Sequence, residues 1–376
     1  TRLLAGPWSH AAPTSSAPGP RIDHVPQMAA FFAEHLGTPP GAPASLPEWS
    51  LPHAWYCRFS HAPSPTLDIV PGEWRADTWQ RTQPREFPLD DRPPYAVRPE
   101  VGIDAWISCA GHLPYGQSGD QRVDDAKSMT WDLPVTDPLE IAGHAHLRAH
   151  VTATCPHPII AVRLCDVDED GTSTLVSRGT LLIDPDGEVD VELEATAYRW
   201  LPGRTLRVSV AGADWPNVVA PGGPGFLTLR DATLTLPIYE PDPAAPVPDF
   251  APGNPESSED TDGITWRIER DVARGITRAV VGSTSDYETP FGSGSERYDG
   301  WVSVDERTFA QHAHSDVEFA LRFTATDTTE AVTATTRSVM DLMTAGDSYD
   351  LRIHLTVWDG DEVIRERTWE QSFPRA

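Results

Sequence analysis

A histidine near the start of the chain is the first residue whose setting suggests chemistry. Residues 3–5, LLA, are typical of the end of a buried strand, and Gly6 with Pro7 would stop that strand. His10 would then lie on a loop just past the carboxyl end of the strand, where open α/β sheets hold ligands and catalytic groups. An ordinary exposed loop histidine would give the same decapeptide, so these residues alone leave both interpretations open.

The acidic stretch DVDEDG, residues 166–171, has the first half of a calcium-binding loop. Asp166, Asp168 and Asp170 have the spacing of ligands, with Gly171 at the turn. The twelfth position is Ser177, however, where such loops need a bidentate glutamate. The flanking segments PIIAVRLC and TLVSRG are typical of strands rather than helices. We therefore predict an acidic hairpin turn, and we expect no metal and no cofactor.

No serine nucleophile is recognisable in this sequence. The stretch GDSYD, residues 346–350, begins like a nucleophile elbow, but Asp350 stands where the elbow needs its last glycine, and a strand pattern follows. We predict a turn there. Carboxylate pairs such as Asp124 with Asp125, or Glu192 with Glu194, could serve acid–base chemistry. Among 56 acidic residues such pairs are expected by chance, so we interpret them as solvated surface.

Charge and cysteine usage restrict the possible partners and compartment. The formal net charge of -27 argues against a nucleic-acid or anionic-membrane partner, since either would need a basic patch. No run of 18 apolar residues suggests a membrane span. The four cysteines are widely spaced and are interpreted as reduced thiols of a cytoplasmic protein: Cys57, Cys109, Cys155 and Cys165. Because Thr1 begins inside a strand pattern, we expect the native amino terminus to lie upstream.

The sequence pattern changes from helical to β-like near residue 40. Before it, VPQMAAFFAEHLGTPP predicts an amphipathic helix that Pro26 begins and Gly37 ends. After it, short β-like runs separated by turn residues predict a sandwich or jelly roll. Residues 238–263 are proline-rich and then acidic, the composition of a linker. The 13 tryptophans could be core residues or, on one sheet face, sugar-stacking platforms.

The clearest element beyond the linker is DLRIHLTVWDGDEVIRERTW. Its apolar residues alternate with polar ones through Leu351, Ile353 and Leu355, and Asp359 with Gly360 supplies a turn. The stretch therefore predicts two antiparallel strands with one face buried.

Several segments, taken in order, resemble one family, the CocE/NonD hydrolases, which include cocaine esterase and X-Pro dipeptidyl-peptidase types. LLAGPWSH is similar to the family's last hydrolase strand and catalytic-histidine loop, and AAFFAEHLG to the helix that follows. Residues 119–143, beginning GDQRVDD, resemble the start of its carboxy-terminal jelly roll, and residues 162–179 and 198–217 its later strands. The resemblance covers about residues 1–237. Residues 264–376 are similar to an extra β domain of longer members.

This resemblance implies a mainly β protein of four parts. Residues 1–40 would be a remnant of an α/β-hydrolase domain, consisting of its last strand and helix and carrying the histidine loop. Residues 41–237 would form a jelly-roll β-sandwich, 238–263 the linker, and 264–376 a second, antiparallel β domain. The catalytic domain that holds the nucleophile and the triad aspartate would precede Thr1.

The resemblance also implies a function, that of a serine hydrolase acting on small esters or X-Pro-type amides. His10 would be the triad histidine, Ser9 only part of its loop, and the chain alone would be inactive. Trp106, Leu113 and Tyr115, ahead of GDQR, would face the substrate, while residues 119–122 would fix a loop.

Two alternatives from other classes stay open. A stand-alone carbohydrate- or ligand-binding sandwich would show a row of exposed tryptophans on one sheet. A module for homo-oligomerisation would show a large apolar interface. If the hydrolase domain is absent, Leu3, Leu4 and the Phe31–Phe32 side of the helix lose their sheet, so we expect an exposed apolar patch or disorder there.

Overall fold

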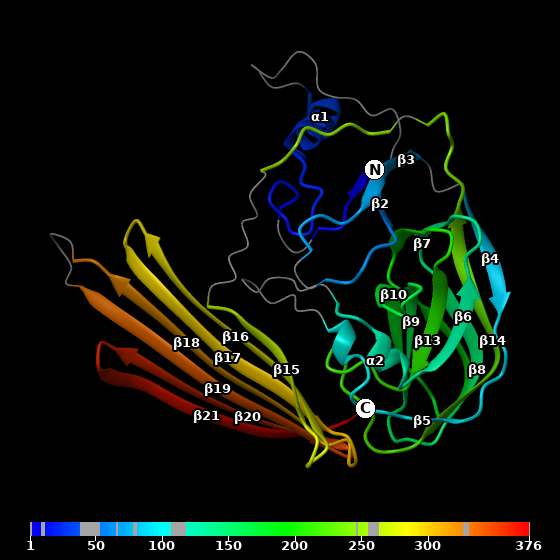
Figure 1. Cartoon of the computed structure of the whole chain (residues 1–376). Coiled ribbons are helices and arrows are strands. Elements are labelled where there is room, and N and C mark those ends of the chain that lie inside the picture. Colours follow the sequence, from blue (N-terminus) through cyan, green and yellow to red (C-terminus); the bar gives the residue numbers. More distant parts are fainter. Residues whose placement is uncertain are drawn as a thin grey trace.

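Three β-sheets make up most of the chain, as the sequence predicts. The computed structural model describes residues 2–8, 12–37, 53–64, 67–77, 81–106, 118–245, 247–254, 263–325 and 331–375. Two of the sheets stack into a sandwich (Figure 1). The third is a single layer that extends away from the sandwich and meets it near the carboxyl end of the chain.

The sandwich consists of a ten-stranded and a four-stranded sheet. The larger sheet has the order β1 (Leu3–Ala5), β2 (His53–Phe59), β12 (Thr196–Trp200), β7 (Leu139–Gly143), β14 (Phe226–Tyr239), β8 (His146–Ala153) and β11 (Asp186–Glu192), with β3 (Gly72–Asp77), β4 (Thr82–Pro88) and β5 (Tyr95–Ala96) attached. The smaller sheet has the order β10 (Ser173–Leu182), β9 (Ile159–Val167), β13 (Thr205–Ala211) and β6 (Met129–Pro134).

The core of the sandwich follows directly from its strand patterns. In β8, Leu147, Ala149 and Val151 alternate with more exposed residues and point inward. The central strand β9 reads IIAVRLCDV and is buried at every position, as a strand covered on both faces must be. Apolar side chains from both sheets, among them Leu164, form one continuous cluster.

The amino-terminal segment lies at the edge of the larger sheet. Its strand β1 pairs in parallel with β2, so the sheet continues across the boundary predicted near residue 40. Helix α1 spans Val25–Leu36, as predicted, and ends at Gly37, whose φ of 87° favours glycine. No residue of α1 is buried, and the Phe32 side chain is 51% exposed, which confirms the exposed apolar patch.

The described part of the predicted linker runs back along the amino-terminal segment. Ala251 O accepts a hydrogen bond from Asp23 N at 2.8 Å, and Arg21 O accepts one from Gly253 N at 3.1 Å. Residues 251–253 are therefore tied to residues 21–23.

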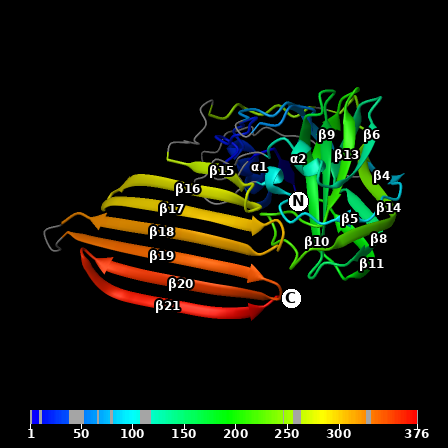
Figure 2. The ribbon, with the colours of Figure 1, turned by 60° about the horizontal axis from the view of Figure 1, so that its bottom comes forward.

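The third sheet is a meander whose strands lie in chain order (Figure 2). Its strands are β15 (Thr265–Asp271), β16 (Ile276–Thr289), β17 (Gly292–Asp305), β18 (Gln311–Phe323), β19 (Val332–Ala345), β20 (Ser348–Asp359) and β21 (Glu362–Pro374). Most have 12 to 14 residues, longer than nearly all strands of the sandwich. Each pairs only with its neighbours in the chain.

The register gives this sheet two unlike faces. Directly opposed residues share a face, and alternate residues of a strand share it too. What we call the apolar face carries the odd-numbered residues of β16, β18 and β20, those of β21 from 365 to 373, and the even-numbered residues of β15, β17 and β19. The polar face carries the alternate positions, including Asp316, Arg337 and Asp341.

One end of the apolar face packs against the sandwich. Ala279 and Val304 are buried there against Ile103 and Trp215. Beside this cluster Gln311 Oε1 accepts a hydrogen bond from the backbone N–H of Ala220 at 3.0 Å. The remaining length of the face is not covered by the described parts of the chain: Phe319, Leu321 and Phe323, on β18, are 38–46% exposed.

The predicted carboxy-terminal hairpin forms, but its predicted burial is wrong. Strands β20 and β21 pair in antiparallel fashion around the turn at Gly360, whose φ is 56°. The alternating residues Leu351, Ile353 and Leu355 do share a face, yet each is only partly buried, because none of the described segments forms a second layer over this part of the sheet.

Two predicted turns are confirmed. DVDEDG joins β9 to β10, and GDSYD lies at the turn from β19 into β20. Cys57, Cys155 and Cys165 are free and buried, whereas Cys109 lies outside the described residues. In the part of the chain that the structure describes, no helix is both long and apolar enough to cross a membrane.

Candidate functional site

The predicted catalytic histidine, His10, lies outside the described residues, but segments before and after it in the chain are described. Trp8 precedes it, fixed by a hydrogen bond of 2.8 Å from Nε1 to Pro20 O, and helix α1 follows. A cavity of about 290 Å³ lies between α1 and the β1 strand. It is mostly apolar and is lined by Arg2, Leu4, Trp8, Pro13, His24, Gln27, Met28, Ala30, Phe31 and Phe32. Residues on both sides of His10 in the chain thus contribute to one cavity.

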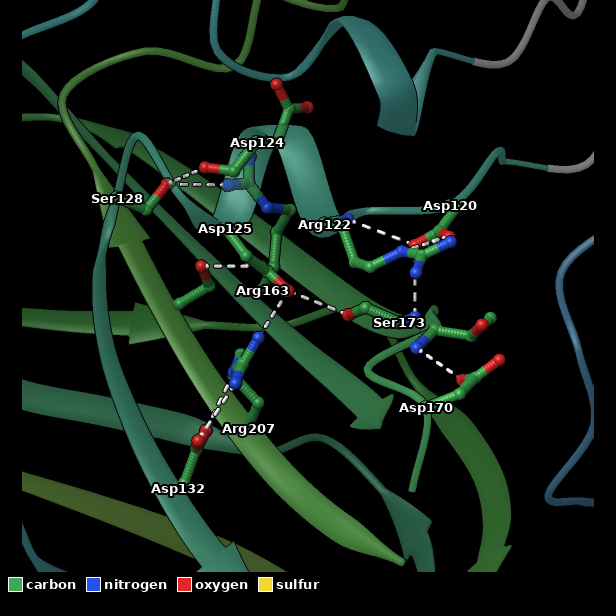
Figure 3. A network of polar contacts seen from close by, with 12 residues as sticks. Asp120, Arg122, Asp124, Asp125, Ser128, Asp132, Arg163, Asp170, Ser173 and Arg207 are labelled. Carbon is green, nitrogen blue, oxygen red and sulfur yellow. Dashed lines mark hydrogen bonds and ion pairs between the residues drawn. The ribbon is translucent and has the colours of Figure 1, made fainter. Parts of the chain in front are cut away.

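A second candidate region is a buried polar network in the sandwich, near the predicted substrate-facing loop (Figure 3). Gln121 is fully buried, and its Nε2 donates to Asp104 O at 2.7 Å and to Gly119 O at 2.9 Å. Asp120 Oδ1 accepts from the backbone N–H of Ser173 at 3.1 Å. These bonds tie the short helix η2 (Ile103–Ala105) to the start of β10, so residues 119–122 hold a connection together.

Asp125 is the centre of this network (Figure 3). It ends the short helix α2 (Arg122–Asp125) and is 4% exposed. Its carboxylate accepts from Ser173 Oγ at 2.7 Å, from Ser209 Oγ at 2.9 Å and from Arg207 Nη1 at 3.2 Å. Arg207 in turn forms a bidentate pair with Asp132, at 2.7 and 2.8 Å. The charge of Asp125 is therefore well compensated despite its burial.

The neighbouring Asp124 is completely buried and less well compensated. Its Oδ2 accepts from the backbone N–H groups of Gly102 at 2.9 Å and Asp104 at 3.1 Å, while no partner is described for Oδ1. Burial raises the pKa of Asp124 to about 7, although the positive charge of the buried Arg163 opposes this rise. Gly102 is required here, because its φ is 108° and a Cβ would lie 2.6 Å from the Asp214 backbone.

The interpretation of Asp124 and Asp125 as solvated surface is therefore wrong. It fails because α2 covers the outer face of strand β13, where Arg207 and Ser209 point away from the apolar core and toward Asp125. The sequence carries a weak signal for this, since RTLRVSV places Arg207 and Ser209 on the same face of a strand. Glu192 and Glu194, by contrast, are exposed, as expected.

Of the three predicted substrate-facing residues, only Trp106 is described. Its ring lies 4.4 Å from that of Trp266 on β15, at the junction between the sandwich and the third sheet. Leu113 and Tyr115 lie outside the described residues. A substrate-binding role for these residues stays a prediction.

The network is suited to support rather than to reaction. Asp125, Arg207 and Ser173 use their polar atoms on one another, and Asp124 is closed off from solvent. Within the described residues, no group of three or more His, Cys, Asp or Glu side chains could hold a metal ion. We interpret the network as a structural support that holds η2 to residues 119–122 and to the start of β10.

Residues 72–245, which include this network, match the family described as the X-Pro dipeptidyl-peptidase C-terminal non-catalytic domain. The chain is therefore similar to the carboxy-terminal portion of CocE/NonD-family hydrolases. His10 precedes the matched residues, whereas Trp106, Asp124 and Asp125 lie within them.

Relatives of known name are similar to the chain in sequence. The chain is 24% identical over 306 residues to a putative serine esterase, Mb1866c, of Mycobacterium bovis, with 64% of this chain and 46% of the relative covered. It is 23% identical over 270 residues to the cocaine esterase of a Rhodococcus species, with 61% and 46% covered. The chain thus spans about half the length of the curated relatives it matches.

The solved structures that the chain resembles have low sequence identity and TM-scores below 0.5. An aminopeptidase from a marine sediment Thaumarchaeota archaeon has a TM-score of 0.48 and 15% identity, over 64% of this chain and 49% of that one. An α-amino acid ester hydrolase has a TM-score of 0.43 and 16% identity, over 63% and 50%.

Proposed function

We propose that this chain is the carboxy-terminal portion of a serine hydrolase that cleaves esters or X-Pro-type amides through an acyl-enzyme. The observation that carries the proposal is the match of residues 72–245 to a domain that accompanies an X-Pro dipeptidyl-peptidase. The relatives named serine esterase and cocaine esterase support the same reaction class. The nucleophile and its orienting carboxylate would come from a part of the parent polypeptide that precedes this sequence.

His10 would act as the general base of this parent enzyme. Its imidazole would take the proton of the serine hydroxyl as the oxygen attacks the substrate carbonyl, and would return that proton to the leaving group. A carboxylate would hold the imidazole in the correct tautomer. Trp8 and Pro13, described residues on either side of His10 in the chain, line the cavity beside α1, and this supports the proposed role for His10.

The sandwich would position the walls of the active site. The buried network around Asp125 fixes η2, from which Trp106 and the segment with Leu113 and Tyr115 continue. We propose that this segment reaches the acyl pocket of the parent enzyme. The apolar cavity beside α1, with the exposed Phe32, would receive side chains of the hydrolase domain.

The proposal is tested with the parent polypeptide and a fluorophosphonate probe, which labels an activated serine. We expect one labelled serine outside residues 1–376, and turnover of p-nitrophenyl esters or X-Pro p-nitroanilides. His10→Ala should lower kcat by about 10⁴-fold, the effect of removing a triad member. The chain 1–376 alone should show neither labelling nor turnover.

His35→Ala is the matched control, because His35 is an exposed histidine on α1 that interacts with Phe31 O at 2.8 Å. It should leave kcat unchanged. Full activity of the His10→Ala parent, or serine-dependent turnover by the chain alone, would contradict the proposal.

A carbohydrate-binding module has less support. Among the tryptophans that the structure describes, only Trp369 is exposed by more than a third, whereas Trp55, Trp131, Trp200 and Trp215 are buried. A row of exposed stacking platforms is therefore not seen in the described parts of the sheets.

A further inference from the structure

Over most of its length, the apolar face of the third sheet has no second layer among the residues that the structure describes. Sheets with one apolar face are stable when that face is buried against another element. Here the sandwich buries Ala279 and Val304 at one end, to 1% and 0% exposure. Further along, Phe319 and Leu321 on β18 and Trp369 on β21 are 37–40% exposed.

The uncovered area is large enough for a stable interface. Seven strands spaced about 4.8 Å apart, each rising about 3.4 Å per residue over some 13 residues, give a face of roughly 1,500 Å². About 1,000 Å² would remain after the end that contacts the sandwich. A stable protein interface needs about 800 Å² from each partner, so the free area of the face is sufficient.

The charge distribution selects the kind of partner. The chain has a formal net charge of -27, so most of its surface repels a second copy. On the apolar face, β16, β18 and β19 carry no Asp, Glu, Lys or Arg. Those on the other strands are few and nearly balanced, and three of them are Glu296 on β17 with Arg365 and Arg367 on β21. Three arginines against two acidic residues leave a net charge of only +1, so this face can meet itself with little like-charge repulsion and offers little to attract a basic or acidic partner.

The polar face is unsuited to such a contact because its charges already pair within the sheet. Arg337 Nε donates to Asp316 Oδ1 at 2.8 Å. His312 Nε2 and His314 Nδ1 both lie within 2.9 Å of Asp341 Oδ1. These groups would have to lose water without gaining new partners if the face were buried.

We propose that the apolar face is the interface of a homodimer, in which two copies of this chain pack their third sheets face to face. A two-fold axis would bring the same patch of each copy onto the other. Each sheet would then be the missing layer of the other, in a sandwich with the strands aligned to within about 30°. This proposal is independent of the proposed catalytic function.

The test is the mass of the chain in solution, measured by sedimentation at micromolar concentrations. We expect twice the 41.2 kDa of one copy. Leu321→Glu on β18 and Ile353→Glu on β20 place a charge on the apolar face, and each should raise the dissociation constant about 30-fold or more. Circular dichroism should show the same strand content in both variants.

Thr333→Glu is the matched control. It adds the same charge to β19 but on the polar face, opposite Arg322, and should leave the dimer intact. A monomeric wild-type chain, or equal loss of the dimer in the Thr333→Glu variant, would overturn the proposal. The parent polypeptide should also be dimeric. A monomeric parent would assign the apolar face to its own hydrolase domain and would equally overturn the proposal.

Discussion

The sandwich and the third sheet are built from the same kind of strand, yet only the sandwich has a core. In both regions apolar and polar residues alternate, as in β8 with Leu147 and Val151 and in β20 with Leu351 and Ile353. The β8 residues are completely buried, whereas the β20 residues are half-exposed. Alternation therefore determines which face a side chain lies on, and the presence of a second layer determines whether it is buried.

The sandwich and the third sheet should differ most in the stability that each loses when an apolar side chain is truncated. Leu164→Ala in β9 should lower the free energy of unfolding by about 2–5 kcal/mol, because Leu164 is fully buried and a cavity would remain. Leu355→Ala in β20 should cost less, about 1–2 kcal/mol, because Leu355 is only partly buried and its truncation leaves no closed cavity. Urea unfolding of both variants in the Leu321→Glu background excludes any contribution from the dimer. Equal costs would show that the third sheet has a core of its own.

A smaller difference in stability is expected when a polar network is broken in the sandwich and when one is broken in the third sheet. Asp125→Ala should cost about 3 kcal/mol, because Arg207 and two buried serine hydroxyls would lose their common acceptor. Arg337→Ala on the polar face should cost at most about 1 kcal/mol, because its pair with Asp316 is exposed. Thermal unfolding would measure both. A cost for Arg337→Ala as large as that for Asp125→Ala would contradict this distinction.

The two regions should also respond to pH with opposite sign. Burial raises the pKa of Asp124 to about 7, so between about pH 4 and 7 the folded chain binds a proton that the unfolded chain has lost. Its stability should fall by up to about 1.4 kcal/mol per pH unit as pH rises through this window. Hydrogen bonds from Arg337 lower the pKa of Asp316, whose contribution is instead lost as pH falls below about 4.

Urea unfolding of the wild-type chain and of Asp124→Asn from pH 4 to pH 7 would measure the first effect. The Asn variant should lack the downward slope. If both chains keep the same slope, Asp124 does not bind the extra proton.

Local patterns were sufficient to predict much of the fold. Helix α1, the acidic turn after β9 and the β20–β21 hairpin each follow from residues close together in the chain, such as Pro26, Gly37 and Gly360. The burial of Asp124 and Asp125 could not be predicted in this way. It depends on Arg207 and Ser209 in β13, which lie more than 80 residues away in the chain.

The exposure of the apolar face of the third sheet could not be predicted from the residues of its strands either. The alternation of Leu351 and Ile353 correctly indicates one apolar face, but nothing in those residues states whether another layer covers it. For the candidate site, the sequence identified the loop-fixing role of residues 119–122, while the role of His10 rests on resemblance and stays a prediction.

The chain order of the strands in the third sheet has a consequence for folding kinetics. Every pairing there joins consecutive strands, so the sheet can grow hairpin by hairpin, each step closing a short loop within microseconds. The sandwich must instead bring together distant segments, such as β4 with β14 and β2 with β12, which is slow because long loops are closed. We therefore expect the third sheet to acquire its strands before the sandwich, although the sandwich precedes it in the chain.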